Sequence, residues 1–235
     1  MKKQRSQQNP TLLHNLQMEL NKRIVIILLI SIASTIIVIS WFLQAPFVSD
    51  KAKIAAVTAL RDRLGSIPEE GTLIIVDYTQ PSQTKRLAVM NLENGRLLFH
   101  TRVAHGKNSG GVYAHKLSNI AGSLQSSAGL FKITDEFNGK HGKSLRLMGL
   151  DPELNSNSKE RGIIIHSAKY VSLKSIIANW KKGFYLGRSA GCFVLSNDSF
   201  NKLNQELIRP AYLYSFHNDN DYSSYQSLPL NKRLK

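Results

Sequence analysis

Residues 86–103 read "RLAVMNLENGRLLFHTRV", and this stretch carries the strongest short-range indication of the fold. Two largely apolar runs, at 86–92 and 96–103, flank the dipeptide Asn94-Gly95. Asn-Gly suits the tight two-residue turn of a β-hairpin because both of its positions tolerate positive φ. The stretch therefore predicts two antiparallel strands joined by a short turn.

Similar short apolar or β-branched runs recur around this hairpin. They predict further strands at residues 72–78, 130–134, 145–148, 162–166 and 211–216. Apolar residues at helical spacing predict helices at residues 51–64, 171–180 and 198–207, the last with Ser196 or Asn197 as its N-cap. Many short strands with few helices indicate a mainly β domain with peripheral helices.

The N-terminal segment has a different composition. Residues 24–43, "IVIILLISIASTIIVISWFL", carry no charge and are long enough to cross a bilayer as a helix. The residues before them hold five Lys and Arg with Glu19 as the one acidic residue, which favours a cytoplasmic N-terminus. A cleavable signal peptide is the alternative. Its apolar core is normally shorter, and "FLQAPF" fits a cleavage site poorly, so a retained signal anchor is favoured.

The chain is thus expected to have five parts. These are a cytoplasmic tail at 1–23, a transmembrane signal anchor at 24–43, a linker with a packing helix at 44–70, a folded domain at 71–216 and a polar tail at 217–235. Residues 44–235 hold 26 Lys and Arg against 15 Asp and Glu. A basic surface favours polyanionic partners or an anionic membrane face. Outside the membrane an anionic envelope polymer fits better than nucleic acid, and a surface that only serves solubility is the other interpretation.

One cysteine, Cys192, lies in the stretch "YLGRSAGCFVL" at 185–195. A lone thiol in an exported protein is exposed to oxidation and forms no intramolecular disulfide. Gly191 permits unusual backbone angles, so the amides of Gly191 and Cys192 could form an oxyanion hole. Ser189 could bond a base or the substrate, and Arg188 could favour the thiolate or bind a carboxylate. A tight turn with the cysteine packed inward fits these residues equally well.

His166 ends the apolar run "GIIIH" and is the candidate base for the cysteine. A histidine bonded to backbone at the rim of the core is the alternative. His105, His115 and His141 raise the possibility of a metal site with Cys192, but no pair has a tight ligand spacing, so no metal is predicted. The segment "SLQSSAGLFKI" could line a cleft beside the cysteine with Ser126, Ser127 and the amide of Gly129, or form a polar turn.

Together these segments resemble a known family. "IIIHSAKY" followed by "GRSAGC", after "SSAGLFKI" and "GKHGKSLRLMGL", is similar to the L,D-transpeptidase catalytic domain family (YkuD-like), and more closely to its murein L,D-transpeptidase catalytic domain-like branch. The likeness runs from about Leu73 to Phe216. It implies a β-sandwich or barrel that transfers acyl groups on peptidoglycan stem peptides through a cysteine thioester. D-Ala leaves, and a second stem's amine or water resolves the thioester.

The resemblance assigns roles to residues of this chain. Cys192 matches the nucleophile, His166 the general base, and Ser189 and Gly191 the Ser and Gly of the signature. Substrate contacts are expected at Arg188, Ser127, Gly129 and His141. Neither a metal nor another cofactor is implied.

The chain also departs from the better-known members. Ala190 stands where they have His and Val194 where they have Arg, and the 26 residues from His166 to Cys192 are more than is usual. The substrate subsites are therefore the least defined part of the expectation. No carboxylate partner for His166 is evident, so a backbone carbonyl or Ser167 is expected to orient it.

The expected setting follows from the anchor and the resemblance. The chain is predicted to be a single-pass protein of the inner, cytoplasmic membrane with its N-terminus in the cytoplasm and its catalytic domain periplasmic or extracytoplasmic. Its expected partners are peptidoglycan stem peptides and the membrane, with no nucleic acid; the oligomeric state is not predicted. An L,D-carboxypeptidase that uses water, a hydrolase of another peptide bond, and a non-catalytic peptidoglycan-binding module are the alternatives.

Overall fold

The computed structural model describes residues 10–44 and 48–217, with side chains at 17–38 and 48–217. The chain divides into two units, residues 1–44 and 45–235. Residues 1–9 of the expected cytoplasmic tail and 218–235 of the expected polar tail lie outside the described residues.

The first unit is one long helix, α1, at Pro10–Gln44. Its segment Gln17–Val38 has a mean hydropathy of 2.0 and is long and apolar enough to cross a membrane. This candidate span overlaps the predicted anchor from Ile24 to Val38, and helix also covers the end of the expected tail. Its length and composition also suit a signal sequence, so an anchor and a signal both fit.

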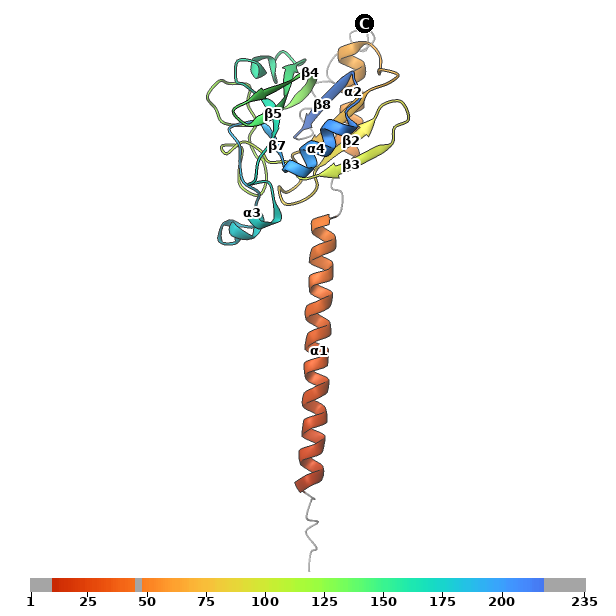
Figure 1. The fold of residues 1–235 in the computed structure, drawn as a ribbon, viewed down its shortest axis with the longest axis vertical. Coiled ribbons are helices and arrows are strands. Elements are labelled where there is room, and N and C mark those ends of the chain that lie inside the picture. The colour runs from red at the N-terminus through yellow and green to blue at the C-terminus, as the bar shows by residue number, and fades with distance from the viewer. Residues whose placement is uncertain (1–9, 45–47, 218–235) are drawn as a thin grey trace, which may run out of the picture. The chain divides into compact units, whose positions relative to one another are not determined.

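The second unit is built on one eight-stranded sheet (Figure 1). The strands are β1 (Thr72–Asp77), β2 (Leu87–Asn91), β3 (Leu97–Thr101), β4 (Gly129–Gly139), β5 (Gly142–Gly149), β6 (Ile164–Ser167), β7 (Phe193–Leu195) and β8 (Ala211–Phe216). Their order across the sheet is β3-β2-β1-β8-β4-β5-β6-β7. β1 with β8 and β6 with β7 are parallel, and the other neighbours are antiparallel. The prediction of a mainly β domain is confirmed.

The two ends of the sheet approach each other just beyond β3. The amide of Ala104 donates to the carbonyl of Val194 in β7 at 2.9 Å, as an antiparallel bridge. The sheet is therefore a nearly closed barrel. Inside it the ring of Phe193 stacks on Tyr78 at 6.2 Å and meets Phe131 edge-on at 5.6 Å. Burying each such ring contributes about 2–3 kcal/mol.

The helices pack against the sheet from both sides. α2 (Asp50–Leu64) begins at Ser49, whose hydroxyl accepts from the amide of Ala52, and ends at Gly65 in a left-handed conformation. α4 (Asn197–Glu206) has the predicted cap, since Ser196 accepts from the amide of Ser199. α3 (Leu173–Ala178) and the 3₁₀ turns at Ser156–Ser158 and Trp180–Lys182 complete the unit.

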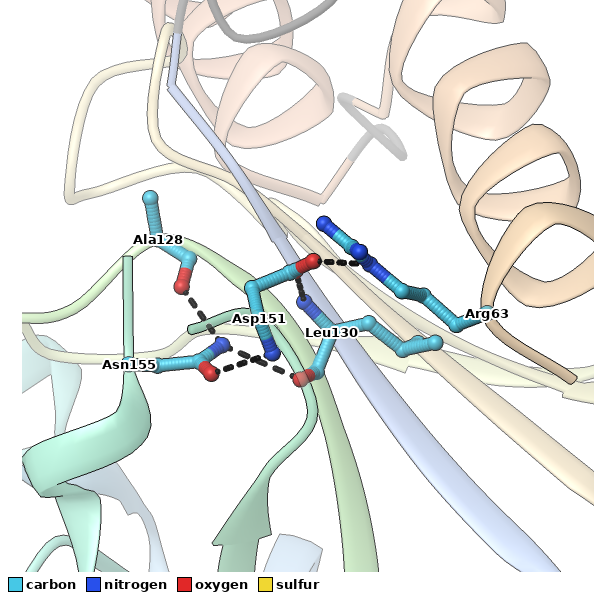
Figure 2. Close-up of polar contacts among 5 residues, drawn as sticks. All are labelled: Arg63, Ala128, Leu130, Asp151 and Asn155. Carbon is cyan, nitrogen blue, oxygen red and sulfur yellow. Dashed lines mark hydrogen bonds and ion pairs between the residues drawn. The ribbon is translucent and has the colours of Figure 1, made fainter. Parts of the chain in front are cut away.

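α2 packs on β1, β4 and β8 through small residues, and Arg63 at its end pairs with the buried carboxylate of Asp151. Its buried side chains are Ala52, Ala55, Ala56, Ala59 and Leu60. Figure 2 shows Arg63 Nε donating to a carboxylate oxygen of Asp151, whose other oxygen accepts from the amide of Leu130 at 2.6 Å. The side-chain amide of Asn155 donates hydrogen bonds to the carbonyls of Ala128 and Leu130, at 2.9 and 3.0 Å. This cluster joins α2 to the start of β4.

Four elements differ from the prediction. β4 and β5 extend beyond 130–134 and 145–148 as a ribbon that ends in the pair Gly139↔Gly142. Its outer part is solvent-exposed, so no buried apolar run marks it; Lys143–Glu136 and Arg146–Asp135 ion pairs link its strands. α3 is shorter than the predicted helix. β7 is a three-residue strand that was not predicted.

Candidate active site

The parallel pair β6 and β7 brings His166 and Cys192 to one face of the sheet. His166 is paired with Val194, and paired residues of neighbouring strands share a face. Cys192 immediately precedes β7 and is half-buried against the hydrophobic cluster that contains Val194, on the side of the sheet to which Val194 points. A predicted base on β6 and a predicted nucleophile just before β7, 26 residues apart in sequence, are thus brought together by two neighbouring strands.

The turn before Cys192 is held by hydrogen bonds to Ser189. The Ser189 amide donates to the carbonyl of His105 at 2.9 Å, and the Ser189 carbonyl accepts from Lys107 at 2.8 Å. Its hydroxyl accepts from the Gly191 amide at 3.0 Å and donates to the Cys192 carbonyl at 2.8 Å. The Gly191 amide, expected as an oxyanion donor, is therefore engaged within the turn.

Gly191 occupies a position that only glycine fits. Its φ is +124°, a backbone conformation that side chains disfavour. A Cβ there would also lie 2.7 Å from the carbonyl oxygen of Gln125 and 3.0 Å from Ile163. The sequence at this position is thus dictated by the close approach of the 118–127 loop.

His166 is oriented by the backbone. Its side chain is buried, and Nδ1 lies 3.0 Å from the carbonyl of Ser167. A carbonyl only accepts, so Nδ1 carries the proton and Nε2 has a free lone pair. Burial, and then the charges of His141 and Lys140, lower the pKa of His166. The imidazole is therefore neutral at neutral pH and able to take up a proton.

The thiol of Cys192 is protonated in this environment. Burial raises its pKa, and the N–H groups of Ile164 and Cys192 together with the charges of Lys140 and Arg161 oppose that rise. The sulfur lies 3.5 Å from the carbonyl of Gly162. Within the described part of the chain, no hydrogen bond joins Cys192 to His166. A neutral thiol and a neutral imidazole are the protonation states that transfer of a proton from sulfur to nitrogen requires.

His141 is the expected substrate residue that comes closest to the base. It projects from the turn between β4 and β5, and its ring stacks on His166 with centroids 4.1 Å apart. A surface pocket of about 430 Å³ adjoins this stack. The pocket is lined by His141, Gly142, Lys143, Ser167, Ala168, Lys169, Asn197, Phe200 and Asn201. Its charged side chains are basic.

Other expected substrate residues have structural partners. Ser127 is fully buried, donates to the Ser118 carbonyl at 3.2 Å and accepts from Arg161. Gly129 begins β4 at φ +88°, where a Cβ would meet Asp151 at 2.3 Å. The structure thus buries both residues rather than exposing them in a cleft.

Arg188 also has partners that occupy part of its guanidinium. Its Nη1 donates to the carbonyls of Lys107 and Gly110, both at 2.9 Å, and the group lies over the Tyr185 ring at 5.1 Å. Arg188 is exposed, and these contacts attach it to the loop beside the Ser189 turn.

A buried arginine that the sequence did not indicate supports the same loop. Arg86 is fully buried and donates to the Val103 carbonyl and to Nδ1 of His105 at 2.8 Å. The other ring nitrogen of His105 donates to the Gly110 carbonyl at 3.2 Å. Burial and then the Arg86 charge lower the pKa of His105 to about 3. His105 is thus a neutral structural residue, and these side-chain bonds hold its backbone carbonyl where it accepts from the Ser189 amide.

The metal interpretation has no geometric support in the described residues. Across the described ranges, no group of three or more His, Cys, Asp or Glu is arranged to hold a metal ion. Nδ1 of His105 instead accepts a hydrogen bond from Arg86, and the ring of His141 stacks on that of His166.

Comparisons with known proteins place the chain in a family. Among similar solved structures, the L,D-transpeptidase from Mycobacterium smegmatis is 13% identical, with 62% of this chain and 58% of that chain covered and a TM-score of 0.38. The one from Xylanimonas cellulosilytica is 14% identical, with 74% and 87% covered and a TM-score of 0.38. The chain thus spans less than two thirds of the Mycobacterium smegmatis protein. No curated protein matches the sequence.

A family model gives the assignment. The model of the L,D-transpeptidase catalytic domain matches residues 46–216, which is more than half of the chain. The chain belongs to the L,D-transpeptidase catalytic domain family.

Proposed function

We propose that this chain is a peptidoglycan L,D-transpeptidase that works through a Cys192 thioester. The observation that carries the proposal is that His166 lies on β6 while Cys192 immediately precedes the neighbouring strand β7, with the imidazole neutral and fixed by the Ser167 carbonyl. Membership of the L,D-transpeptidase family supports the same reaction class. The expected donor is a tetrapeptide stem.

The first half-reaction transfers the stem to the enzyme. Nε2 of His166 takes the thiol proton as the sulfur of Cys192 bonds to the carbonyl carbon of the third residue. The bond from that carbon to the nitrogen of D-Ala breaks, and the proton passes from His166 to the departing amine. With the Gly191 amide bonded to Ser189, the amide of Cys192 is the remaining backbone donor of the predicted pair.

The second half-reaction releases the stem. An amine of a second stem loses a proton to His166 and attacks the thioester, and the sulfur leaves with that proton as the thiol. Water in place of the amine would make the chain an L,D-carboxypeptidase. Preference for the amine requires that the acceptor be positioned and water kept out.

The proposed setting is the cytoplasmic membrane. The apolar part of α1 serves as a retained anchor with the N-terminus in the cytoplasm, and residues 46–216 act outside the membrane. The basic character of residues 44–235 suits the anionic wall polymer.

The test uses the full chain in detergent with disaccharide-tetrapeptides. Released D-Ala, cross-linked dimers and the intact mass of the protein are measured for wild type, Cys192→Ala and His166→Gln, with His115→Gln as an exposed histidine control. We expect an acyl adduct and products in wild type and the control, with neither in the two variants. Equal product formation by wild type and Cys192→Ala would reject the cysteine mechanism. Tripeptide without dimers would identify a carboxypeptidase, and binding without an adduct would identify a non-catalytic module.

A further inference from the structure

The guanidinium of Arg161 donates hydrogen bonds to several groups of the 118–127 loop. Arg161 lies in the turn before β6 and is half-buried. Nη1 donates to the Ser118 carbonyl and the Ser127 hydroxyl, and Nη2 donates to the Ser123 hydroxyl at 3.2 Å and the Gln125 carbonyl at 2.5 Å. Four acceptors from one loop thus converge on one side chain.

These four acceptors are all neutral. No ion pair among the described residues includes Arg161, so its charge has no carboxylate partner there. Burial lowers the pKa of Arg161, and the negative charge of a Cys192 thiolate opposes that change. A partly buried cation is costly unless an anion compensates it. The thiolate is the anion that this position offers.

Arg161 is also packed against the backbone next to the nucleophile. A Cβ built on Gly191 would lie 3.4 Å from Nη2 of Arg161 and 2.7 Å from the Gln125 carbonyl oxygen. The guanidinium, the loop carbonyl and the Gly191 backbone are therefore in close contact. Moving Arg161 would move both the loop and the turn that carries Cys192.

We propose that Arg161 is a positioning residue of the site, which holds the 118–127 loop against Gly191 and supplies the positive charge that stabilises the Cys192 thiolate. The inference deepens the proposed function and rests on Cys192 being its nucleophile. It gives a role to a residue that the sequence alone did not single out.

Other titratable groups face Cys192 from neighbouring elements. Lys140, in the turn between β4 and β5, also lowers the pKa of the thiol. Tyr78 and Tyr170 interact with the sulfur, and burial raises the pKa of each to about 12, so both are neutral at working pH. Since His166 is neutral as well, Arg161 and Lys140 are the cations whose removal should change thiolate formation.

The experiment measures alkylation of the full chain by iodoacetamide as a function of pH. Cys192 is the one cysteine, so the rate reports on that thiol alone. We expect Arg161→Met to be alkylated about tenfold more slowly at pH 7 with its pH profile moved to higher pH, and Arg161→Lys to recover part of the loss. Arg146→Met is the matched control, because Arg146 pairs with Asp135 on the exposed ribbon.

A second pair of variants separates charge from folding. Arg161→Gln keeps an amide donor for the loop carbonyls without the charge and should also react slowly, which covers the case that Arg161→Met does not fold. Ser123→Ala removes one loop contact and keeps the charge, so its profile should match wild type. A wild-type profile in folded Arg161→Met or Arg161→Gln would overturn the proposal and leave a structural role only. The assay needs no peptidoglycan, so a failed transpeptidase test with a shifted alkylation profile would reject the proposed function and leave only the electrostatic effect of Arg161 on the Cys192 thiol.

Discussion

The ring of His166 lies on the ring of His141, with 4.1 Å between centroids and 15° between planes. The pairing of Ser144 with His166 across β5 and β6 brings the turn that carries His141 to this position. A charge on His141 therefore acts on the proposed base at short range.

Replacing His141 by Phe keeps the stack and removes the charge. Burial is the main cause that lowers the pKa of His166, and the His141 charge lowers it further. We expect His141→Phe to raise the pKa of His166, so the acidic limb of kcat/KM for D-Ala release should move to higher pH. An acidic limb identical to that of wild type would contradict the coupling.

His105 should make the fold acid-sensitive. Its pKa is about 3 in the folded protein, against the ordinary 6.5 expected after unfolding. Between these values the unfolded chain binds a proton that the folded chain does not, so the stabilisation is complete above pH 6.5 and declines as pH falls. The loss is about 2 kcal/mol between pH 6.5 and pH 5. Urea unfolding in detergent measures the free energy of unfolding at both pH values. We expect the loss of this free energy from pH 6.5 to pH 5 to be smaller in His105→Gln than in wild type. An equal loss in both proteins would refute the role of His105.

The buried carboxylate of Asp151 should be important for stability. Asp151→Ala removes the acceptor for the buried Leu130 amide and the partner of Arg63, so we expect a loss of about 3 kcal/mol. Arg63→Met should cost about 1 kcal/mol, because the Arg63 side chain is 35% exposed. Lys53→Met, at the exposed pair with Asp50 of 2.9 Å on the same helix, is the control with a near-zero effect. Denaturant midpoints give the loss of stability in each of the three variants. Equal losses would contradict a special role for the buried Asp151 carboxylate.

Gly191→Ala should disable the site. A methyl group at φ +124° would meet the Gln125 carbonyl at 2.7 Å, so the turn must move away from the loop. We expect more than about a hundredfold loss of acyl-enzyme formation, measured by intact mass, since a 1 Å misplacement can cost that much. Ala190→Ser, at the exposed neighbouring position, should retain activity. Near-normal acylation of Gly191→Ala would show that the turn tolerates the shift.

The hairpin and the buried strands were predictable because Asn94-Gly95 and the run at 72–78 are local signals. His166 at the end of an apolar run and Cys192 after a glycine are also local patterns, so both candidates follow from the sequence. The buried environments of Arg86 and Arg161 were not predictable in the same way. Each is a charged residue whose partners come from distant segments, so no periodicity marks it.

β7 illustrates the same limit at the level of the fold. Three residues are too few for a pattern, and this strand exists because β6 supports it on one side. Cys192 directly precedes this strand, so the least predictable strand fixes the position of the proposed nucleophile.

The bond from Ala104 to Val194 has a consequence for association between molecules. A sheet that ends in an unpaired strand offers its backbone groups to the strand of another chain, which promotes aggregation. At Val194 that edge is already occupied by the segment after β3. The segment after β3 thereby keeps the strand that follows Cys192 from serving as a template for edge-to-edge assembly.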